Sequence, residues 1–226
     1  VVHSDDLGKT WSEPRLITSD YYCSSPIRQL SDGRLALGLY KETEGLSHGA
    51  VVFSNDDGLT WETPVDIDNN GMPLDAETDL IELKDGTLHA AQRSGGDSMA
   101  WSESKDGGKT WSISERYGFP GHAPYLHRTV DDILILAHRL PQTSLHYSFD
   151  EGKTWSDSVL VDNHIGSYPS MVNLKDGTVL IVYYEEGEHS NIRAKRFLAN
   201  SKGIHWMPVE RGVVPKATLV DYARIW

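Results

Sequence analysis

Long apolar runs are absent from this sequence of 226 residues, of which 38% are hydrophobic. No stretch reaches the roughly 18 consecutive apolar residues that a membrane-spanning helix needs, so we expect no membrane insertion. The first residues, from Val1 onward, show neither the charged nor the apolar region of a signal peptide. A leader peptide, where the protein uses one, has therefore been removed or lies upstream.

Cysteine is almost missing as well. Cys23 stands alone, so the chain cannot form a disulfide with itself, and its redox compartment is not indicated. We interpret Cys23 as a small buried apolar residue, the usual state of a free cysteine. The ten histidines include no His-x-x-x-His pair and have no cysteine partner, so metal-ligand spacing is lacking. We therefore expect neither a metal nor another cofactor.

Positive charge is in short supply. The chain has 21 Lys and Arg against 33 Asp and Glu, which gives a net charge of −12, and the acidic residues are scattered. Nucleic acids and anionic membranes both require a basic surface, so neither is expected as a partner. A small anionic substrate stays compatible, because it responds to arginines within a Debye length of about 8–10 Å more than to the total charge.

What the sequence does contain is an internal repeat. Four segments share the pattern Ser-x-Asp-x-Gly-x-Thr-Trp and end at Trp11, Trp61, Trp111 and Trp155, and a worn fifth copy ends at Trp206. The Asp can accept hydrogen bonds from backbone N–H groups of its own turn, and the Gly permits a positive φ. The hydroxyls tie the loop and the Trp packs beneath it. We interpret this turn, the Asp box, as structural, with no catalytic or metal-binding role for its aspartates.

A second turn lies between the boxes. Leu-x-Asp-Gly ends at Gly33, Gly86 and Gly177, with a worn copy at Asp132, and Asp-Gly between alternating apolar residues predicts a hairpin. Strand-like runs follow these turns at Arg34–Tyr40, Thr87–Gln92, Ile133–Ala137 and Thr178–Tyr184. Each repeat therefore reads as strand A, Asp-Gly turn, strand B, strand C, Asp box and strand D. Four strands in about fifty residues are typical of a propeller blade.

The expected fold class is all-β, a β-propeller of four-stranded antiparallel blades that forms one domain over residues 1–226. Complete blades are expected at residues 22–68, 75–117, 122–162 and 167–210. Residues 1–17 supply only the last strands of an opening blade. Either residues 213–226 close that blade by strand exchange, giving five blades, or the chain is truncated at its N-terminus and the propeller has six blades when complete. We favour truncation, because the tail is one strand long where two are missing.

Two positions of each repeat meet at one end of the predicted channel. Strand A begins nine residues before the Asp-Gly glycine, and strand B approaches its end seven residues after it. Because strands A and B are antiparallel, both positions lie at the same mouth. In chain order they are Ser24, Glu77, Ala123 and Tyr168 on strand A and Tyr40, Arg93, Arg139 and Tyr184 on strand B, with His122 beside them. The alternative is that the two arginines are ordinary surface cations and that the glutamate pairs with one of them.

The Asp boxes on an all-β repeat resemble the sialidase (neuraminidase) superfamily over essentially the whole chain. Asp75-Ala76-Glu77, followed by Arg93, resembles the segment that gives sialidases a glutamate and a substrate-binding arginine. Arg139 is similar in place to a further arginine of the family's triad, and Gly166–Ser170 resembles the segment with the tyrosine nucleophile. The resemblance implies that Tyr168 is the nucleophile, Glu77 its general base, and Arg93 with Arg139 the carboxylate clamp. Substrate-binding roles are also expected at the mouth for His122, Tyr184 and Tyr40.

The chemistry of sialic acid explains this set of residues. The sugar carries a carboxylate on its anomeric carbon, and planar guanidinium groups match carboxylate geometry. A carboxylate nucleophile would be repelled by that group, whereas a neutral tyrosine is not, and a neighbouring glutamate can take its proton.

Two departures from the family pattern stand out. In the family, the opening blade carries the first triad arginine, in an Arg-Ile-Pro-like motif, and the acid/base aspartate. Residues 1–17 of this sequence supply only the last strands of that blade. Pro169 follows Tyr168 where the family usually has a small polar residue. Arg28 follows Pro26-Ile27 in reversed order and in the second blade, so we do not assign it to the triad.

Three functions compete on these observations. The first is an exo-glycosidase of sialidase type that releases terminal sialic acid or a related acidic sugar from glycoconjugates. The second is a propeller polysaccharide lyase acting on uronic acids through His122, Tyr168 and Arg93. The third is a non-catalytic carbohydrate-binding propeller. The partner is a carbohydrate in each case, the family resemblance favours a secreted or periplasmic location, and the sequence does not indicate an oligomeric state.

Overall fold

The computed structural model describes residues 1–43, 46–96, 98–163, 166–186 and 191–208. These residues form sixteen β-strands, and none of them lies in a helix that could cross a membrane. The strands are β1 (Arg28–Gln29), β2 (Leu35–Thr43), β3 (Leu46–Ser54), β4 (Val65–Asp66), β5 (Leu74–Glu82), β6 (Leu88–Ser94), β7 (Ala100–Ser104), β8 (Glu115–Arg116), β9 (His122–Arg128), β10 (Leu134–Arg139), β11 (Thr143–Ser148), β12 (Val159–Asp162), β13 (Gly166–Asn173), β14 (Val179–Glu185), β15 (Ile192–Asn200) and β16 (Gly203–Trp206).

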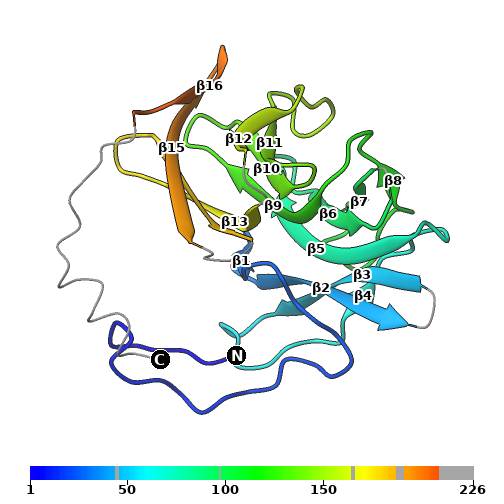
Figure 1. Cartoon of the computed structure of the whole chain (residues 1–226). Coiled ribbons are helices and arrows are strands. Elements are labelled where there is room, and N and C mark those ends of the chain that lie inside the picture. The colour runs from blue at the N-terminus through cyan, green and yellow to red at the C-terminus, as the bar shows by residue number, and fades with distance from the viewer. Residues whose placement is uncertain (44–45, 97, 164–165, 187–190, 209–226) are drawn as a thin grey trace.

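Each set of four consecutive strands forms an antiparallel sheet in chain order, as the repeat predicts. The first two sheets are joined at one bridge, between Ser47 and Leu74. The four sheets spread like a fan around a common centre, with β5, β9 and β13 packed side by side along it (Figure 1). This confirms the all-β, propeller-like fold of four-stranded blades. Residues 213–226 lie outside the described residues, so closure by strand exchange stays a prediction.

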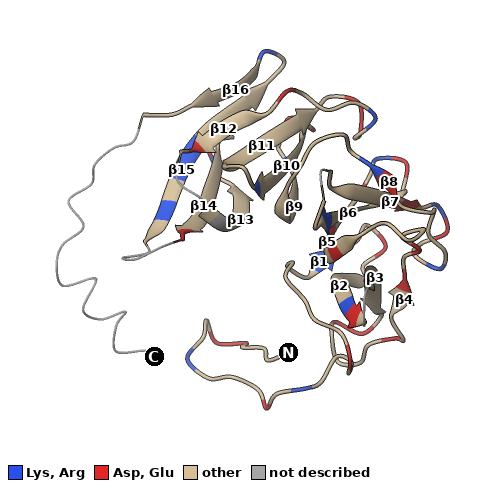
Figure 2. Cartoon of the chain, turned by 45° about the vertical axis from the view of Figure 1, so that its right-hand side comes forward, with Lys and Arg blue, Asp and Glu red and all other residues tan. Residues whose placement is uncertain are grey.

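The hydrophobic core lies between neighbouring sheets. Ile135 and Leu145 of the third blade pack with Ile181 and Phe197 of the fourth, and all four are fully buried. Strand alternation explains this arrangement, because every second side chain of a central strand faces the next blade. Charged residues, by contrast, are distributed along the strands and turns of all four sheets (Figure 2).

The Asp boxes form the hydrogen bonds that their residue types predict. In the third box, Asp106 Oδ1 accepts from the Ser104 hydroxyl at 2.8 Å and from the Thr110 N–H at 2.9 Å. The Thr110 hydroxyl donates to Asp106 Oδ2 at 2.6 Å, and Gly108 has a φ of 92°. The other three complete boxes repeat these bonds. Their aspartates are thus engaged within their own turns.

These turns should make stability sensitive to acid. Hydrogen bonds from the Thr110 hydroxyl and N–H lower the pKa of Asp106 from 3.8 to about 2. Because the folded-state pKa lies below the unfolded one, the stabilisation is complete above pH 3.8 and is lost as the pH falls towards about 2. We expect Asp106→Asn to flatten this pH dependence, measured as the urea midpoint of tryptophan fluorescence. Asp131→Asn, at an exposed turn, is the matched control and should keep the parent's profile. An Asp106→Asn profile equal to the parent's would contradict the expectation.

Two local expectations are corrected. Trp61, Trp111 and Trp155 pack against buried clusters, but Trp11 is 63% exposed. The Trp11 ring still lies under its Asp box, since a Cβ added to Gly8 would be 3.7 Å from it. The ring is exposed because residues 1–20 contain no strand that could pair with an inner neighbour and cover it. Cys23 is exposed rather than buried, because the stretch around it is tied to the sheet by a single bridge.

A buried ion pair near the centre joins three blades. Arg28 of β1 donates to Asp79 of β5 through Nε at 3.1 Å and through Nη2 at 2.5 Å. The same Nη2 donates to the carbonyl of Leu126 in β9 at 2.7 Å. Asp79 is fully buried and also accepts from the backbone N–H groups of Leu126 and Leu80. Arg28 is therefore engaged in holding the inner strands together.

Candidate active site

Each of the inner strands β5, β9 and β13 begins with a β-bulge at the same end of the fan. One residue of each bulge has a left-handed backbone: Ala76 with φ 60°, Ala123 with φ 51° and Tyr168 with φ 48°. That conformation costs a residue other than glycine about 1–3 kcal/mol, and such strain gathers at functional sites. The bulges therefore mark this end of the fan as the candidate site.

Proline accompanies two of these bulges. Pro124 follows Ala123 and Pro169 follows Tyr168, and both prolines lie between paired residues of the ladder. Proline has no N–H, so at an unpaired bulge position it removes no ladder hydrogen bond. It also disfavours the right-handed helical conformation at the residue before it. The departure at Pro169 is thus compatible with the strand pairing of β13.

Glu77 is the centre of the site. It is 3% exposed, and its Oε1 accepts a hydrogen bond of 2.5 Å from the Tyr168 hydroxyl. Arg93 Nη1 lies 3.1 Å from the same oxygen, and the Ala123 N–H donates to Oε2 at 3.2 Å. The carboxylate is thereby held by groups from β6, β9 and β13 while it belongs to β5. The shortest of these contacts is the hydrogen bond from the Tyr168 hydroxyl.

The bulge of β5 is wider than the others and lies one residue pair further from its Asp-Gly turn, and this displacement places Glu77. Three residues stand opposite one between Leu74 and Thr78, whereas two stand opposite one in β9 and β13. Counting from the Asp-Gly turn equates Glu77 with Tyr168, but the backbone equivalent of Tyr168 is Ala76. The ladder of β5 continues for one more pair, to Thr78 and Gln92, so its bulge stands opposite Arg93 and begins with Glu77.

Tyr168 is a neutral phenol at this site. Burial raises its pKa to about 12, aided by the hydrogen bond to Glu77 and by the charge of that carboxylate, while Arg93 and Arg139 act in the opposite sense. The side chain is still 39% exposed, so its ring is open to the mouth. A neutral hydroxyl that donates to a buried carboxylate can lose its proton as it forms a bond, without being ionised beforehand.

The two arginines are held by acidic partners. Arg93 Nε lies 3.1 Å from Asp75 Oδ2, in addition to its contact with Glu77. Arg139 Nη1 contacts the carboxylate of Glu186. Among the described residues, nothing accepts a hydrogen bond from the buried Nε–H of Arg139. A buried donor left unpaired is unfavourable, so this guanidinium retains capacity for an anionic ligand.

His122 is the ladder partner of Arg139 at the mouth end of β9 and β10. Burial lowers its pKa, and the charges of Arg93 and Arg139 lower it further. Asp75 and Glu77 act in the opposite sense. The imidazole is therefore neutral at pH 7 and can accept or donate a hydrogen bond at the mouth.

Tyr184 and Tyr40 flank the group from two sides. The Tyr184 ring is stacked on Tyr168, with 6.2 Å between centroids. Tyr40 packs against the cluster that contains Ala76, and burial followed by the charge of Glu77 raises its pKa. Of the seven residues with an expected catalytic or binding role, Tyr168, Glu77 and Arg93 touch directly, Tyr184 stacks on Tyr168, and His122 is the ladder partner of Arg139.

Two acidic residues of the site carry no role in the sequence interpretation. Asp75 is part of the Asp-Ala-Glu segment, and its position in the wide bulge turns it towards Arg93. Glu186 lies two residues after Tyr184, and strand alternation could have indicated that the two share a face. Over the described residues no cluster of three or more His, Cys, Asp or Glu side chains could hold a metal ion.

Fold and site together define the class of protein. It is an Asp-box β-propeller whose channel mouth carries a tyrosine–glutamate pair flanked by arginines. Residues 1–181 match the family of BNR repeat-like domains, so the chain belongs to that family, within the sialidase superfamily.

Two curated sialidases are relatives of the chain. An anhydrosialidase of Macrobdella decora is 32% identical over 122 residues, which are 49% of this chain and 16% of the relative. A sialidase of Bacteroides fragilis is 25% identical over 221 residues, which are 84% of this chain and 40% of the relative. The chain therefore spans well under half the length of these proteins.

Solved structures support the fold. The intramolecular trans-sialidase of Ruminococcus gnavus in complex with oseltamivir carboxylate superposes with a TM-score of 0.67 at 22% identity, covering 87% of this chain and 49% of that one. A protein of unknown function from Dyadobacter fermentans gives 0.69 at 21% identity, covering 85% and 61%.

Proposed function

We propose that this chain provides the catalytic mouth of a sialidase-type exo-glycosidase, which hydrolyses terminal sialic acid or a related acidic sugar from glycoconjugates. The observation that carries the proposal is the 2.5 Å hydrogen bond from the Tyr168 hydroxyl to Glu77 Oε1. Arg93 and Arg139 lie beside this pair and can receive the carboxylate of the sugar. Membership of the BNR repeat-like family supports the same class of reaction.

In the proposed reaction Tyr168 attacks the anomeric carbon. Its oxygen forms the new bond as its proton passes to Glu77, and the aglycone leaves with the electron pair of the glycosidic bond. Water then attacks the same carbon and releases one proton to the solvent, while the tyrosine oxygen leaves with the bonding electron pair and takes back the proton that Glu77 holds. Because the pKa of Tyr168 is about 12, both transfers need the carboxylate in place.

The arginines explain the selectivity of the proposed site. The carboxylate of Glu186 contacts Arg139, and this supports a carboxylate-binding role for the guanidinium. The Nε–H of the same side chain, which has no acceptor within the described part of the chain, gains one when an acidic sugar binds. A sugar without a carboxylate leaves that donor unsatisfied, so neutral glycosides should be poor substrates.

We also propose that residues 1–17 belong to a further blade of the same domain. Backbone hydrogen bonds join Val1 to Arg15 and His3 to Ser12 across the first Asp box, at 2.5–2.9 Å. This is the pairing of strands C and D in the other blades. The family places its acid/base aspartate in that blade, so tests of this chain need a substrate whose leaving group departs without protonation.

The proposed function is tested by its product. An aryl sialoside with an acidic phenol as leaving group should yield free sialic acid, or its 2,7-anhydro form, detected by chromatography. The anhydro product is included because a related protein is an anhydrosialidase. A uronic-acid polysaccharide should yield no ultraviolet-absorbing unsaturated product. Formation of that product would establish the lyase alternative, and saturable binding without turnover would establish a binding propeller.

Arg93→Lys should weaken the affinity for an acidic sugar by about 1–3 kcal/mol, because the charge is kept but the planar fork is lost. Sialic acid binding, measured by titration calorimetry, provides the readout. Arg196→Lys is the matched control, since Arg196 pairs with an exposed aspartate on another blade. Equal affinity of Arg93→Lys and the parent would refute the clamp.

A further inference from the structure

The repeat is broken at the interface between the second and third blades, on the end of the fan opposite the candidate site. In the first and third blades an aromatic residue precedes the Ser of the Asp box and reaches the box glycine of the next blade. The contact is close: a Cβ atom added to Gly108 would lie 2.1 Å from the Phe53 ring, and one added to Gly203 would lie 2.9 Å from the Tyr147 hydroxyl. In the second blade the equivalent residue is Glu103. The three atoms nearest to a Cβ added to Gly152, the box glycine of the third blade, belong to other residues.

The floor of this interface differs as well. The third residue after the Asp-Gly turn is Ala36, Ile135 and Leu180 in three blades, and it is His89 in the second. His89 is 2% exposed, and its Nε2 lies 2.6 Å from the Tyr117 hydroxyl. Its Nδ1 lies 3.3 Å from Glu103. The second blade thus has polar side chains, Glu103 and His89, at two positions where the other blades compared have aromatic or aliphatic ones.

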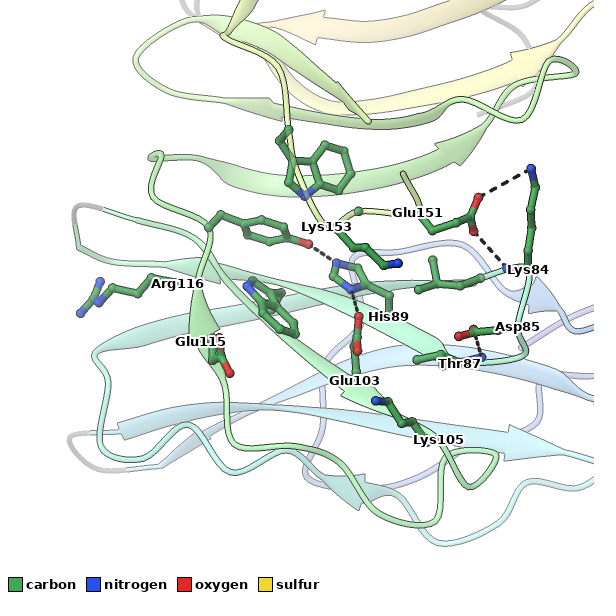
Figure 3. A pocket seen from close by; sticks show the side chains of 15 residues that line it. Lys84, Asp85, Thr87, His89, Glu103, Lys105, Glu115, Arg116, Glu151 and Lys153 are labelled. Carbon is green, nitrogen blue, oxygen red and sulfur yellow. Dashed lines mark hydrogen bonds and ion pairs between the residues drawn. The ribbon is translucent and has the colours of Figure 1, made fainter. Parts of the chain in front are cut away.

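The result is an open groove of about 710 Å³ between the second and third blades (Figure 3). Trp101 lines it together with Tyr117 and Trp155, and the Trp101 ring is stacked on that of His89 at 5.6 Å. A second hollow, of about 460 Å³, shares Trp101, Glu103 and Lys105. These three side chains alternate along β7 and its turn, so they form one continuous strip between the two hollows.

The charges of the groove are balanced. Lys84, Lys105, Arg116 and Lys153 are matched by as many carboxylates, as the labelled side chains of Figure 3 show. Several are already paired, for example Glu151 with Arg128 at 2.7 Å and with the Lys84 N–H at 3.0 Å. A ligand of either sign would gain little net attraction here. The groove therefore suits a neutral ligand with many hydroxyl groups and one apolar face.

We propose that this groove is a second carbohydrate-binding site that holds neutral sugar units of a glycan. The C–H face of a pyranose ring packs on the half-exposed Trp101, and its hydroxyls meet the charged rim as donors and acceptors. The groove contains the Asp-Gly turn of the second blade and the Asp box of the third, whereas the candidate active site lies at the other end of the same strands. The two sites therefore engage different glycan chains, which strengthens attachment to a densely glycosylated surface.

The test measures binding of lactose, N-acetyllactosamine and cellobiose, none of which carries a carboxylate. Saturation-transfer NMR on the whole chain should show transfer to these sugars. Trp101→Ala removes the stacking surface, and Glu103→Phe restores the plug that Phe53 supplies in the first blade. Both variants should lose the signal while keeping the thermal midpoint and the parent's turnover of an aryl sialoside.

Trp11→Ala is the matched control, because Trp11 is exposed on a different segment, and it should retain the signal. The proposal is overturned when none of the three sugars binds the parent, when both Trp101→Ala and Glu103→Phe keep the signal, or when Trp11→Ala loses it equally. Loss of the signal in Arg93→Lys alone would place the sugar at the channel mouth and also overturn it. Because binding is read without turnover, failure here leaves the proposed hydrolysis untouched.

Discussion

Tyr168→Phe should abolish turnover of an aryl sialoside while it leaves binding of the acidic sugar largely intact. The change removes one oxygen, the atom proposed to attack the anomeric carbon, and keeps the ring that stacks on Tyr184. The arginines that would bind the sugar's carboxylate are unaltered. The rate constant for turnover should therefore fall, whereas the dissociation constant should change little.

The expected loss in turnover is about 10⁴-fold or more, because removing the nucleophile of other covalent catalysts costs at least that much. Release of the phenol gives the rate, and titration calorimetry gives the affinity. Tyr147→Phe is the matched control, since Tyr147 precedes an Asp box at the opposite end of the fan and its hydroxyl lies at Gly203, and its rate should equal the parent's. Turnover by Tyr168→Phe at the parent's rate would exclude a tyrosine nucleophile without affecting the fold.

Arg28→Leu should cause the largest loss of stability among single changes of charged residues. It removes the only ion-pair partner that the described residues offer to Asp79, which is fully buried. A buried charge left without its partner costs about 3–5 kcal/mol. The free energy of unfolding, from urea denaturation, should fall by that amount.

Arg196→Leu provides the comparison. Its partner, Asp176, is exposed, and exposed ion pairs contribute about 1 kcal/mol or less. A difference between the two variants smaller than the uncertainty of the measurement would mean that the three-blade contact does not support the fold. The urea dependence itself should be unchanged in both, because the area exposed on unfolding is the same.

The blades could be predicted from the sequence because their signals are local. Ser, Asp, Gly, Thr and Trp act within one turn, so Asp106 and Gly108 take the same conformation wherever the motif stands. Counting from the Asp-Gly turns also brought Tyr168, Glu77 and Arg93 to one mouth, since strand pairing transmits register along each blade.

Other parts of the site depend on contacts between blades, which leave no local pattern. The left-handed residues of the bulges are Ala76, Ala123 and Tyr168, and none is the glycine that would have marked a positive φ. The extra residue in the bulge of β5 is invisible to counting. The pairing of Arg28 with Asp79 likewise joins residues 51 positions apart on different blades.

The position of Glu77 limits how this molecule can be rearranged. A blade is held mostly by bonds within its own turns and ladders, so it could be duplicated or exchanged as a cassette. Glu77 is an exception, because Ala123 of the next blade and Tyr168 of the one after it both donate to its carboxylate. A chimera that imports the second blade alone would carry the acid without two of its donors. The repeat can be inherited piece by piece, whereas the proposed chemistry has to be inherited as three consecutive blades.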